Sequence, residues 1–283
     1  MPSSLATRLR VLAGSAVLLS LPLAGGAEAA DASESVHKSR HAAAGRLAPP
    51  VEGKTLVFGE EFDGPIEWGT KWTGDRTSAF SHVDHDPEFY NLDWLTKDAV
   101  TVHGGLARFT ATPSAHTLEN GKQAWDTGLI TTEYTDRGFQ VRAGDYIETR
   151  VQLPDGVGAW PSLWTWSVDH PEDAGNDEID TFEYHPDGPY NLELTNHVKP
   201  DVDNYTNSDV VKPCEWITIG TYYGVDSVDW YVNGEKVFSD GLGVTGPEWE
   251  SHVVMNMSVS DGTYHPAPTE PIDFWADYIR VYR

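Results

Sequence analysis

Short stretches in which apolar and polar residues alternate, with turn residues between them, fill most of the chain after about position 54. A period of two is typical of β-strands that bury one face, and dipeptides such as Asn120-Gly121 and Asn233-Gly234 are typical of tight turns. There is no long helical period, no βαβ alternation and no internal repeat. We therefore expect an all-β fold, a β-sandwich of two curved antiparallel sheets whose concave face forms a cleft for an extended polymer. The expected strands are Ala99–Val102, Leu106–Ala111, Tyr146–Leu153, Ile217–Tyr223, Val228–Val232, Val253–Ser258 and Trp275–Tyr282.

The acids of one segment, Gly175–Tyr184, are the strongest candidates for chemistry. In a regular strand Glu178 and Asp180 share one face and Glu183 points to the other. A one-residue bulge at Thr181-Phe182 would bring all three acids to the same face. Two carboxylates on one face are what the cleavage of a glycosidic bond requires, one as nucleophile and one as general acid/base. A solvated acidic edge or a calcium loop is the alternative for these acids.

Tryptophans are concentrated just upstream, in Gly156–Trp166. The three indoles at Trp160, Trp164 and Trp166 exceed what a core usually takes in seven residues. Aromatic faces are good platforms for the apolar faces of sugar rings. Beside the acid motif, these residues indicate a protein that acts on a polysaccharide.

Several motifs, in the same order along the chain, resemble glycoside hydrolase family 16, in its laminarinase-like branch with the bulged form Glu-x-Asp-x-x-Glu. The resemblance covers most of the chain after Thr55. Apart from the acid motif, its motifs are Glu61–Gly64, Thr127–Thr131, Trp160-Pro161, Asp229–Gly234 and Trp275–Tyr282.

The resemblance implies a β-jelly roll and a retaining, double-displacement mechanism. It implies Glu178 as the nucleophile and Glu183 as the general acid/base, with Asp180 between them to hold the nucleophile. Crowding of the three acids should raise the pKa of at least one of them, which suits an acid/base that starts protonated. We expect no cofactor to be required for the chemistry.

Four further residues are expected to contact the polysaccharide: Trp160, Trp164, His197 and Asn256. Trp160 and His197 match positions of the family that lie at the cleft. Either Trp164 or Trp166 is expected to face the interior instead, on the view that alternation does not put all three indoles on one side. Asn256 is polar within an apolar strand, so it needs either the substrate or a structural hydrogen bond.

The resemblance implies an endo-acting hydrolase of a neutral β-glucan, with β-1,3 linkages favoured over mixed β-1,3/1,4 linkages. A galactan such as agarose is an alternative substrate, because the bulged motif also occurs in galactan-cleaving relatives. A non-catalytic, lectin-like carbohydrate-binding sandwich is an alternative from another class. The simultaneous presence of Glu178 and Glu183 favours the enzyme, since a binding module needs no such pair.

A structural calcium ion away from the cleft is also implied by the resemblance. Its ligands would be Glu61 from the first strand, the backbone near Gly105, and Asp277 from the last strand. Oxygen ligands of this kind suit calcium.

The net charge and the N-terminal segment limit the partners and the cellular location that we expect. The formal charge of −25 argues against nucleic acid and anionic membranes as partners, and it disfavours polyanionic polymers. Residues 1–29 are typical of a secretory signal peptide, with an apolar run too short for a membrane span. Residues 30–53 are expected to be a flexible leader and residues 54–283 a single catalytic domain. We expect a secreted, extracellular monomer. No intramolecular disulfide can form, because Cys214 is the only cysteine.

Overall fold

A computed structural model describes residues 49–79, 90–168 and 177–283 of the chain. They belong to one compact unit, Gly45–Arg283. The predicted signal peptide and nearly all of the predicted leader lie outside the described residues. No helix in the described part of the chain is long and apolar enough to cross a bilayer.

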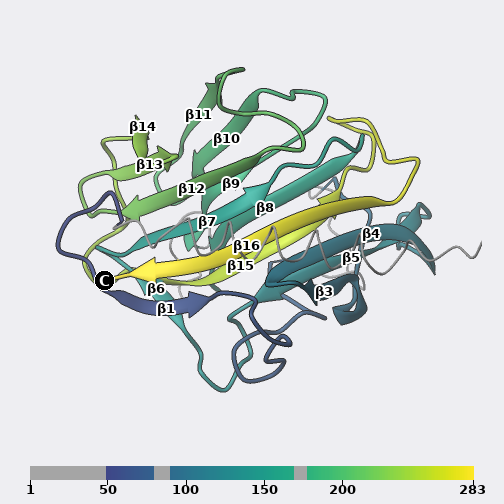
Figure 1. Cartoon of the computed structure of the whole chain (residues 1–283), viewed down its shortest axis with the longest axis horizontal. Coiled ribbons are helices and arrows are strands. Elements are labelled where there is room, and N and C mark those ends of the chain that lie inside the picture. Colours follow the sequence, from purple (N-terminus) through teal and green to yellow (C-terminus); the bar gives the residue numbers. More distant parts are fainter. Residues whose placement is uncertain (1–48, 80–89, 169–176) are drawn as a thin grey trace, which may run out of the picture. The chain divides into compact units, whose positions relative to one another are not determined.

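Strands dominate the described residues, and they group into two sheets (Figure 1). We name the first the backing sheet; its strand order is β14-β13-β12-β7-β16-β4, with β1 beside β16 and β3 beside β4. Its strands are β1 (Leu56–Glu60), β3 (Val100–His103), β4 (Leu106–Thr117), β7 (Tyr146–Gln152), β12 (Trp216–Tyr223), β13 (Val228–Val232), β14 (Glu235–Ser239) and β16 (Ile272–Tyr282).

The second sheet carries the acid motif, and we name it the acid-bearing sheet. Its strand order is β11-β10-β9-β8-β15-β5, with β6 beside β15 and β2 beside β5. All pairings between these strands are antiparallel except that of β2 with β5. The β4–β5 pairing joins the two sheets, and a 3-10 turn, η1 (Lys97–Ala99), precedes β3. The strands are β2 (Asp93–Leu95), β5 (Gln123–Thr131), β6 (Gln140–Arg142), β8 (Ala159–Trp166), β9 (Ile179–Glu183), β10 (Asn191–Asn196), β11 (Asp201–Thr206) and β15 (Glu250–Val259).

One large apolar core includes side chains from both sheets. Leu163 and Met255 of the acid-bearing sheet belong to it together with Phe109, Ile147 and Trp230 of the backing sheet, and all five are fully buried. Burial of each such side chain contributes about 1.5–3 kcal/mol. The predicted all-β sandwich is therefore confirmed, and every strand expected from alternation has a counterpart, although β4 continues to Thr117, beyond its expected end at Ala111.

Strand β9 contains the predicted bulge. Leu163 of β8 pairs with Phe182, whereas the next residue of β8, Trp164, pairs with Asp180, so Thr181 is the extra residue. The pairing of β9 with β10 shifts at the same place. Both Thr181 and Phe182 are fully buried as a result, and the parity of the strand changes between Asp180 and Glu183.

A buried hydrogen bond ties the backing sheet to this bulge. The indole nitrogen of Trp230 on β13 donates to the backbone carbonyl of Asp180 over 2.8 Å. Trp230 is fully buried, and its ring stacks on Phe238 with 5.1 Å between the ring centroids. The indole thus positions the backbone of β9 immediately before the extra residue.

We predict that Trp230→Phe lowers the free energy of unfolding by about 1–3 kcal/mol, because it removes this hydrogen bond and leaves space in the core. Urea denaturation measures the change. Trp216→Phe is the matched control, because Trp216 on β12 is only half-buried and lies under the guanidinium of Arg150. Its expected loss is less than about 1 kcal/mol. Equal losses in the two variants would contradict a special role for Trp230.

Candidate active site

A pocket on the acid-bearing sheet contains the predicted acids. It is formed by neighbouring strands β9, β8 and β15 and by the segment that precedes β2. Its lining residues are Asn91, Trp160, Ser162, Trp164, Glu178, Asp180, Glu183, Asn256 and Ser258. The structure therefore brings together all three predicted acids and three of the four predicted substrate contacts, and the fourth, His197, contacts Asp180.

The bulge explains why the acids meet. Ile179 and Phe182 point into the core, so Asp180 and Glu183 lie on the opposite face, where they line the pocket with Glu178. Without the extra residue, Glu183 would take the parity of the core positions. The predicted arrangement of the three acids on one face is confirmed.

His197 completes a compact polar cluster with two of the acids. Its Nε2 lies 3.0 Å from Oδ2 of Asp180. One ligand-type atom from each of Glu178, Asp180 and His197 lies within 4.8 Å of the other two. The backbone nitrogen of His197 donates to the backbone carbonyl of Glu178 over 3.1 Å, which places the imidazole beside the acids.

Glu183 lies in a setting that favours its protonated form. The indole nitrogen of Trp160 donates to Oε1 of Glu183 over 2.7 Å. Burial and the negative charge of Asp180 raise the pKa of Glu183 to about 8, although the Trp160 hydrogen bond and His197 lower it. A carboxyl group with such a pKa carries its proton at neutral pH, as a general acid must.

Charges also interact around Glu178 and His197. Burial and the charge of Asp180 raise the pKa of Glu178, whereas His197 lowers it. Burial alone would lower the pKa of His197, but the hydrogen bond to Asp180 and the charges of the acids raise it to about 9. The imidazole is therefore a cation at neutral pH, it donates to Asp180, and it offsets the repulsion between the carboxylates.

A chain of hydrogen bonds holds the floor of the pocket. The indole nitrogen of Trp164 donates to Oδ1 of Asn256 over 2.8 Å, and Nδ2 of Asn256 donates to Oγ of Ser258 over 2.7 Å. The hydroxyl of Ser258 donates in turn to Asp93, whose other oxygen accepts from the backbone nitrogen of Val259. Asn256 therefore has the structural partner that the sequence left open, and it lines the pocket as well.

The expectation that Trp164 or Trp166 faces the core is wrong. Positions 160, 164 and 166 have the same parity in β8, so alternation places all three indoles on the face of the acids. Trp164 and Trp166 pack with Leu129 and Val254 in an apolar cluster separate from the main core. Trp166 is buried in that cluster and does not line the pocket.

Sequence reasoning missed Asn91, Ser162 and Ser258 as pocket residues. Ser162 lies two residues after Trp160 and Ser258 two residues after Asn256, so their shared parity could have identified them. Asn91 lies just before β2 and carries no periodic signal. Its Oδ1 is buried and has no hydrogen-bond partner among residues 49–79, 90–168 and 177–283, which leaves it available to a ligand in the pocket.

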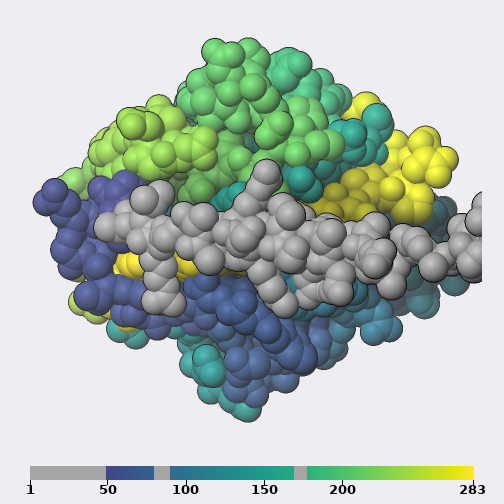
Figure 2. All heavy atoms as spheres, viewed as in Figure 1, coloured from purple at the N-terminus to yellow at the C-terminus, as the bar shows by residue number. Residues whose placement is uncertain are grey.

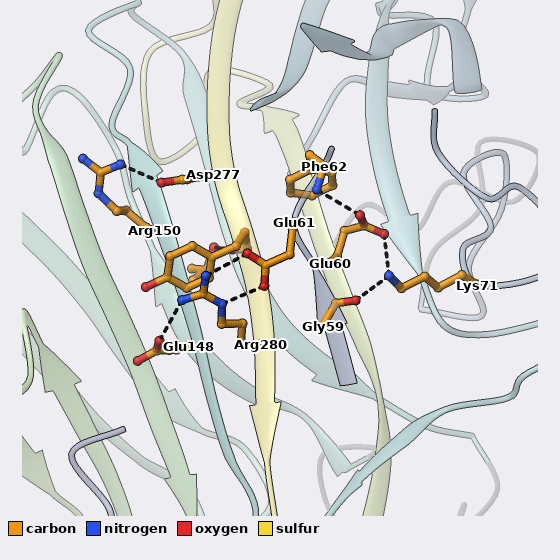
Figure 3. A network of polar contacts seen from close by, with 11 residues as sticks. Gly59, Glu60, Glu61, Phe62, Lys71, Glu148, Arg150, Asp277 and Arg280 are labelled. Atoms are coloured by element: carbon orange, nitrogen blue, oxygen red, sulfur yellow. Dashed lines mark hydrogen bonds and ion pairs between the residues drawn. The ribbon is translucent and has the colours of Figure 1, made fainter. Parts of the chain in front are cut away.

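The predicted calcium ligands do not fit a calcium site in this structure. Both oxygens of Glu61 accept from Arg280, over 2.8 and 2.7 Å, and Oδ2 of Asp277 accepts from Arg150 over 2.7 Å (Figure 3). Arginine therefore supplies the positive charge at both carboxylates. Gly105 lies in the turn between β3 and β4 with a φ of 81°.

Known proteins that are similar to this chain include β-1,3-glucanases. No family model matches the chain. Glucan endo-1,3-beta-glucosidase A1 of Niallia circulans is 25% identical over 275 residues, which cover 83% of this chain. The chain matches only 39% of that protein's length.

Solved structures share the fold over most of the chain. The catalytic domain of an endo-1,3-beta-glucanase (laminarinase) from Thermotoga petrophila has a TM-score of 0.68 at 24% identity, covering 82% of this chain and 99% of that chain. An endo-beta-1,3-glucanase from Pyrococcus furiosus has a TM-score of 0.70 at 20% identity, with 82% and 96% covered. The chain has the laminarinase fold. The resemblance to glycoside hydrolase family 16 is thereby borne out at the level of the fold.

A third structure was crystallised with an oligosaccharide. A Glu-to-Ser variant of SCLam, a non-specific endo-beta-1,3(4)-glucanase from family GH16, holds 1,3-beta-D-cellobiosyl-glucose at its active site. It has a TM-score of 0.68 at 21% identity, and the match covers 84% of this chain and 97% of that chain.

We predict that Trp160→Phe raises the pKa of Glu183 above its value of about 8, because the hydrogen bond that it removes lowers that pKa. Carbon-13 NMR of labelled glutamate carboxyl groups measures the titration, and Glu183→Gln assigns the signal. Trp164→Phe is the matched control, because its indole donates to Asn256 and not to Glu183. A fall of the Glu183 pKa in Trp160→Phe would contradict the assignment of this hydrogen bond.

Proposed function

We propose that the chain is an endo-acting, retaining glycoside hydrolase that cleaves β-1,3 or mixed β-1,3/1,4 linkages in a neutral β-glucan. The observation that carries this proposal is the bulge in β9, which puts Glu178, Asp180 and Glu183 on one face of the pocket. Similarity to endo-1,3-beta-glucanases supports the substrate class. It favours neither a galactan nor a lectin-like role.

In the first step Glu178 attacks the anomeric carbon while Glu183 gives its proton to the glycosidic oxygen. The bond between that carbon and oxygen breaks, and a glycosyl ester forms on Glu178. We expect the two carboxyl groups to lie about 5–5.5 Å apart in the substrate complex, as retaining enzymes require. The neutral form of Glu183, favoured by burial and by Asp180, suits this role.

In the second step Glu183, now ionised, takes a proton from water, and the water oxygen attacks the same carbon. The ester breaks, Glu178 returns to a carboxylate, and the sugar keeps its original anomeric configuration. Asp180 and His197 act beside this exchange: the imidazolium stays against Asp180 and lowers the pKa of both glutamates. His197 thus favours the ionised form of Glu178, whereas the charge of Asp180 favours the protonated form of Glu183.

The half-buried Trp160 combines two roles in this proposal. Its indole nitrogen holds Glu183, and its ring is available to the face of a sugar. Among the residues that line the pocket there is no lysine or arginine, which suits an uncharged polymer. We also propose that the protein is secreted and acts as a monomer, on the basis of the signal-like residues 1–29 and the absence of any sequence feature that indicates a protein partner.

The central test measures reducing ends released from a β-1,3-glucan, a mixed-linkage glucan and agarose. We predict cleavage of one or both glucans and a loss of roughly 10³-fold or more in kcat for Glu178→Gln, because the variant lacks the nucleophile. Glu235→Gln, on the exposed β14, is the matched control and should keep full activity. Proton NMR of the first product should show the retained anomer. Binding without cleavage by the wild-type chain would instead support the lectin-like alternative.

We predict a bell-shaped pH dependence of kcat/KM with its alkaline limb near the Glu183 pKa of about 8. Above that pH Glu183 loses the proton that it must donate, and on the acid side Glu178 becomes protonated and cannot attack. Initial rates on the preferred glucan, measured across the pH range, check this. A rate that still rises near pH ~10 would exclude Glu183 as the general acid.

A further inference from the structure

A second cluster of metal-ligand side chains lies beside the pocket and takes no part in the proposed reaction. It consists of His185, Asp187 and His265. One ligand-type atom from each lies within 4.8 Å of the other two. His185 and Asp187 follow β9, whereas His265 belongs to the connection between β15 and β16, which is yellow at the surface in Figure 2.

The contacts of this cluster are close. The imidazole rings of His185 and His265 stack with 3.5 Å between their centroids and 12° between their planes. Nδ1 of His265 lies 3.1 and 3.2 Å from the two carboxylate oxygens of Asp187. The ring of Trp160 also lies near His185, with 5.1 Å between the ring centroids.

Within the described part of the chain, one nitrogen of the cluster has no hydrogen-bond partner. His185 is only 6% exposed, and its Nδ1 is buried without a hydrogen bond. A buried imidazole nitrogen without a partner is unfavourable, and such groups in folded proteins usually bind a polar group or an ion. The position of His185 among an imidazole and a carboxylate points to an ion.

We propose that His185, Asp187 and His265 bind a divalent transition-metal ion such as Zn²⁺. Two imidazoles and one carboxylate are a known zinc ligand set, which leaves a fourth position for water. Nitrogen ligands favour zinc, copper or nickel over calcium or magnesium.

The distances suit such an ion. Ligand atoms around a tetrahedral zinc lie about 3.3 Å apart, as follows from metal–ligand bonds of about 2.0–2.1 Å. The 3.1 Å between His265 and Asp187 is already close to this value. Parallel rings do not aim their nitrogens at one point, so His265 must turn out of the stack when the ion binds. Its place in a connection between strands, with an exposed Asp187 beside it, allows that turn.

A bound ion would link the end of β9 to the β15–β16 connection, two segments that are far apart in the sequence. Because the unfolded chain lacks the preformed cluster, metal binding should raise the melting temperature. This site does not depend on the proposed hydrolase function, and it is separate from the Glu178–Asp180–His197 cluster, which also contains metal-ligand atoms.

Isothermal titration of the chelator-treated chain with ZnCl₂ tests the proposal, with two histidine-to-glutamine variants as a matched pair. The wild-type chain and His197→Gln should bind zinc with the same affinity, and His265→Gln should bind it roughly tenfold or more weakly. Asp187→Asn is a second variant of the site with the same expected loss, in case one of them does not fold. Circular dichroism and the metal-free melting temperature confirm folding.

Three outcomes would overturn the proposal. One is the absence of zinc binding by the wild-type chain. Another is full-strength binding in both His265→Gln and Asp187→Asn. A loss of binding in His197→Gln, alone or with the other variants, would place the ion at the Glu178–Asp180–His197 cluster and would also overturn it. A zinc-dependent rise in melting temperature that disappears in His265→Gln but persists in His197→Gln would support it independently.

Discussion

One extra residue in one strand determines the arrangement of the candidate site. With Thr181 inserted, β9 turns two successive side chains, Thr181 and Phe182, into the interior, and Glu183 emerges on the side of Asp180. An insertion that breaks the ladder must be held by its surroundings. The hydrogen bond from Trp230 and the burial of Phe182 in the common core supply that support from the opposite sheet. The geometry of the acids is thus a property of the whole sandwich.

The negative charges of the acid cluster are offset by one imidazolium and one neutral indole, and not by lysine or arginine. Three carboxyl groups close together in a partly buried pocket repel one another, and burial adds to the cost of their charges. The imidazolium of His197 and the indole of Trp160 offset part of this cost. Lysine or arginine here would lower the pKa of Glu183 far more. The proton that the proposed chemistry needs would then be lost.

Much of the fold and of the candidate site could be predicted from the sequence. Strand parity indicates which side chains share a face, and the order of the motifs along the chain indicates the fold. The bulge was predictable because only a shift at Thr181-Phe182 lets the three acids share a face. The expectation that Trp164 or Trp166 faces the interior was an error of parity, because positions 160, 164 and 166 lie an even number of residues apart in one strand. Asn91 follows no period, and its place in the pocket comes from an antiparallel bridge to Ser260, just after β15, which local sequence does not indicate. Glu61 and Asp277 form ion pairs with arginines of neighbouring strands. These pairs depend on strand register, which a single sequence does not reveal.

The position of the last strand bears on how this protein is made. Strand β16 is not at an edge: it pairs with β4, β7 and β1, and Leu56 in β1 lies opposite Tyr282. The backing sheet therefore cannot close until the final eleven-residue strand has left the ribosome. Contacts between such distant parts of a chain slow folding, and the incomplete chain keeps open strand edges until then. Folding of this domain must therefore follow the synthesis of β16.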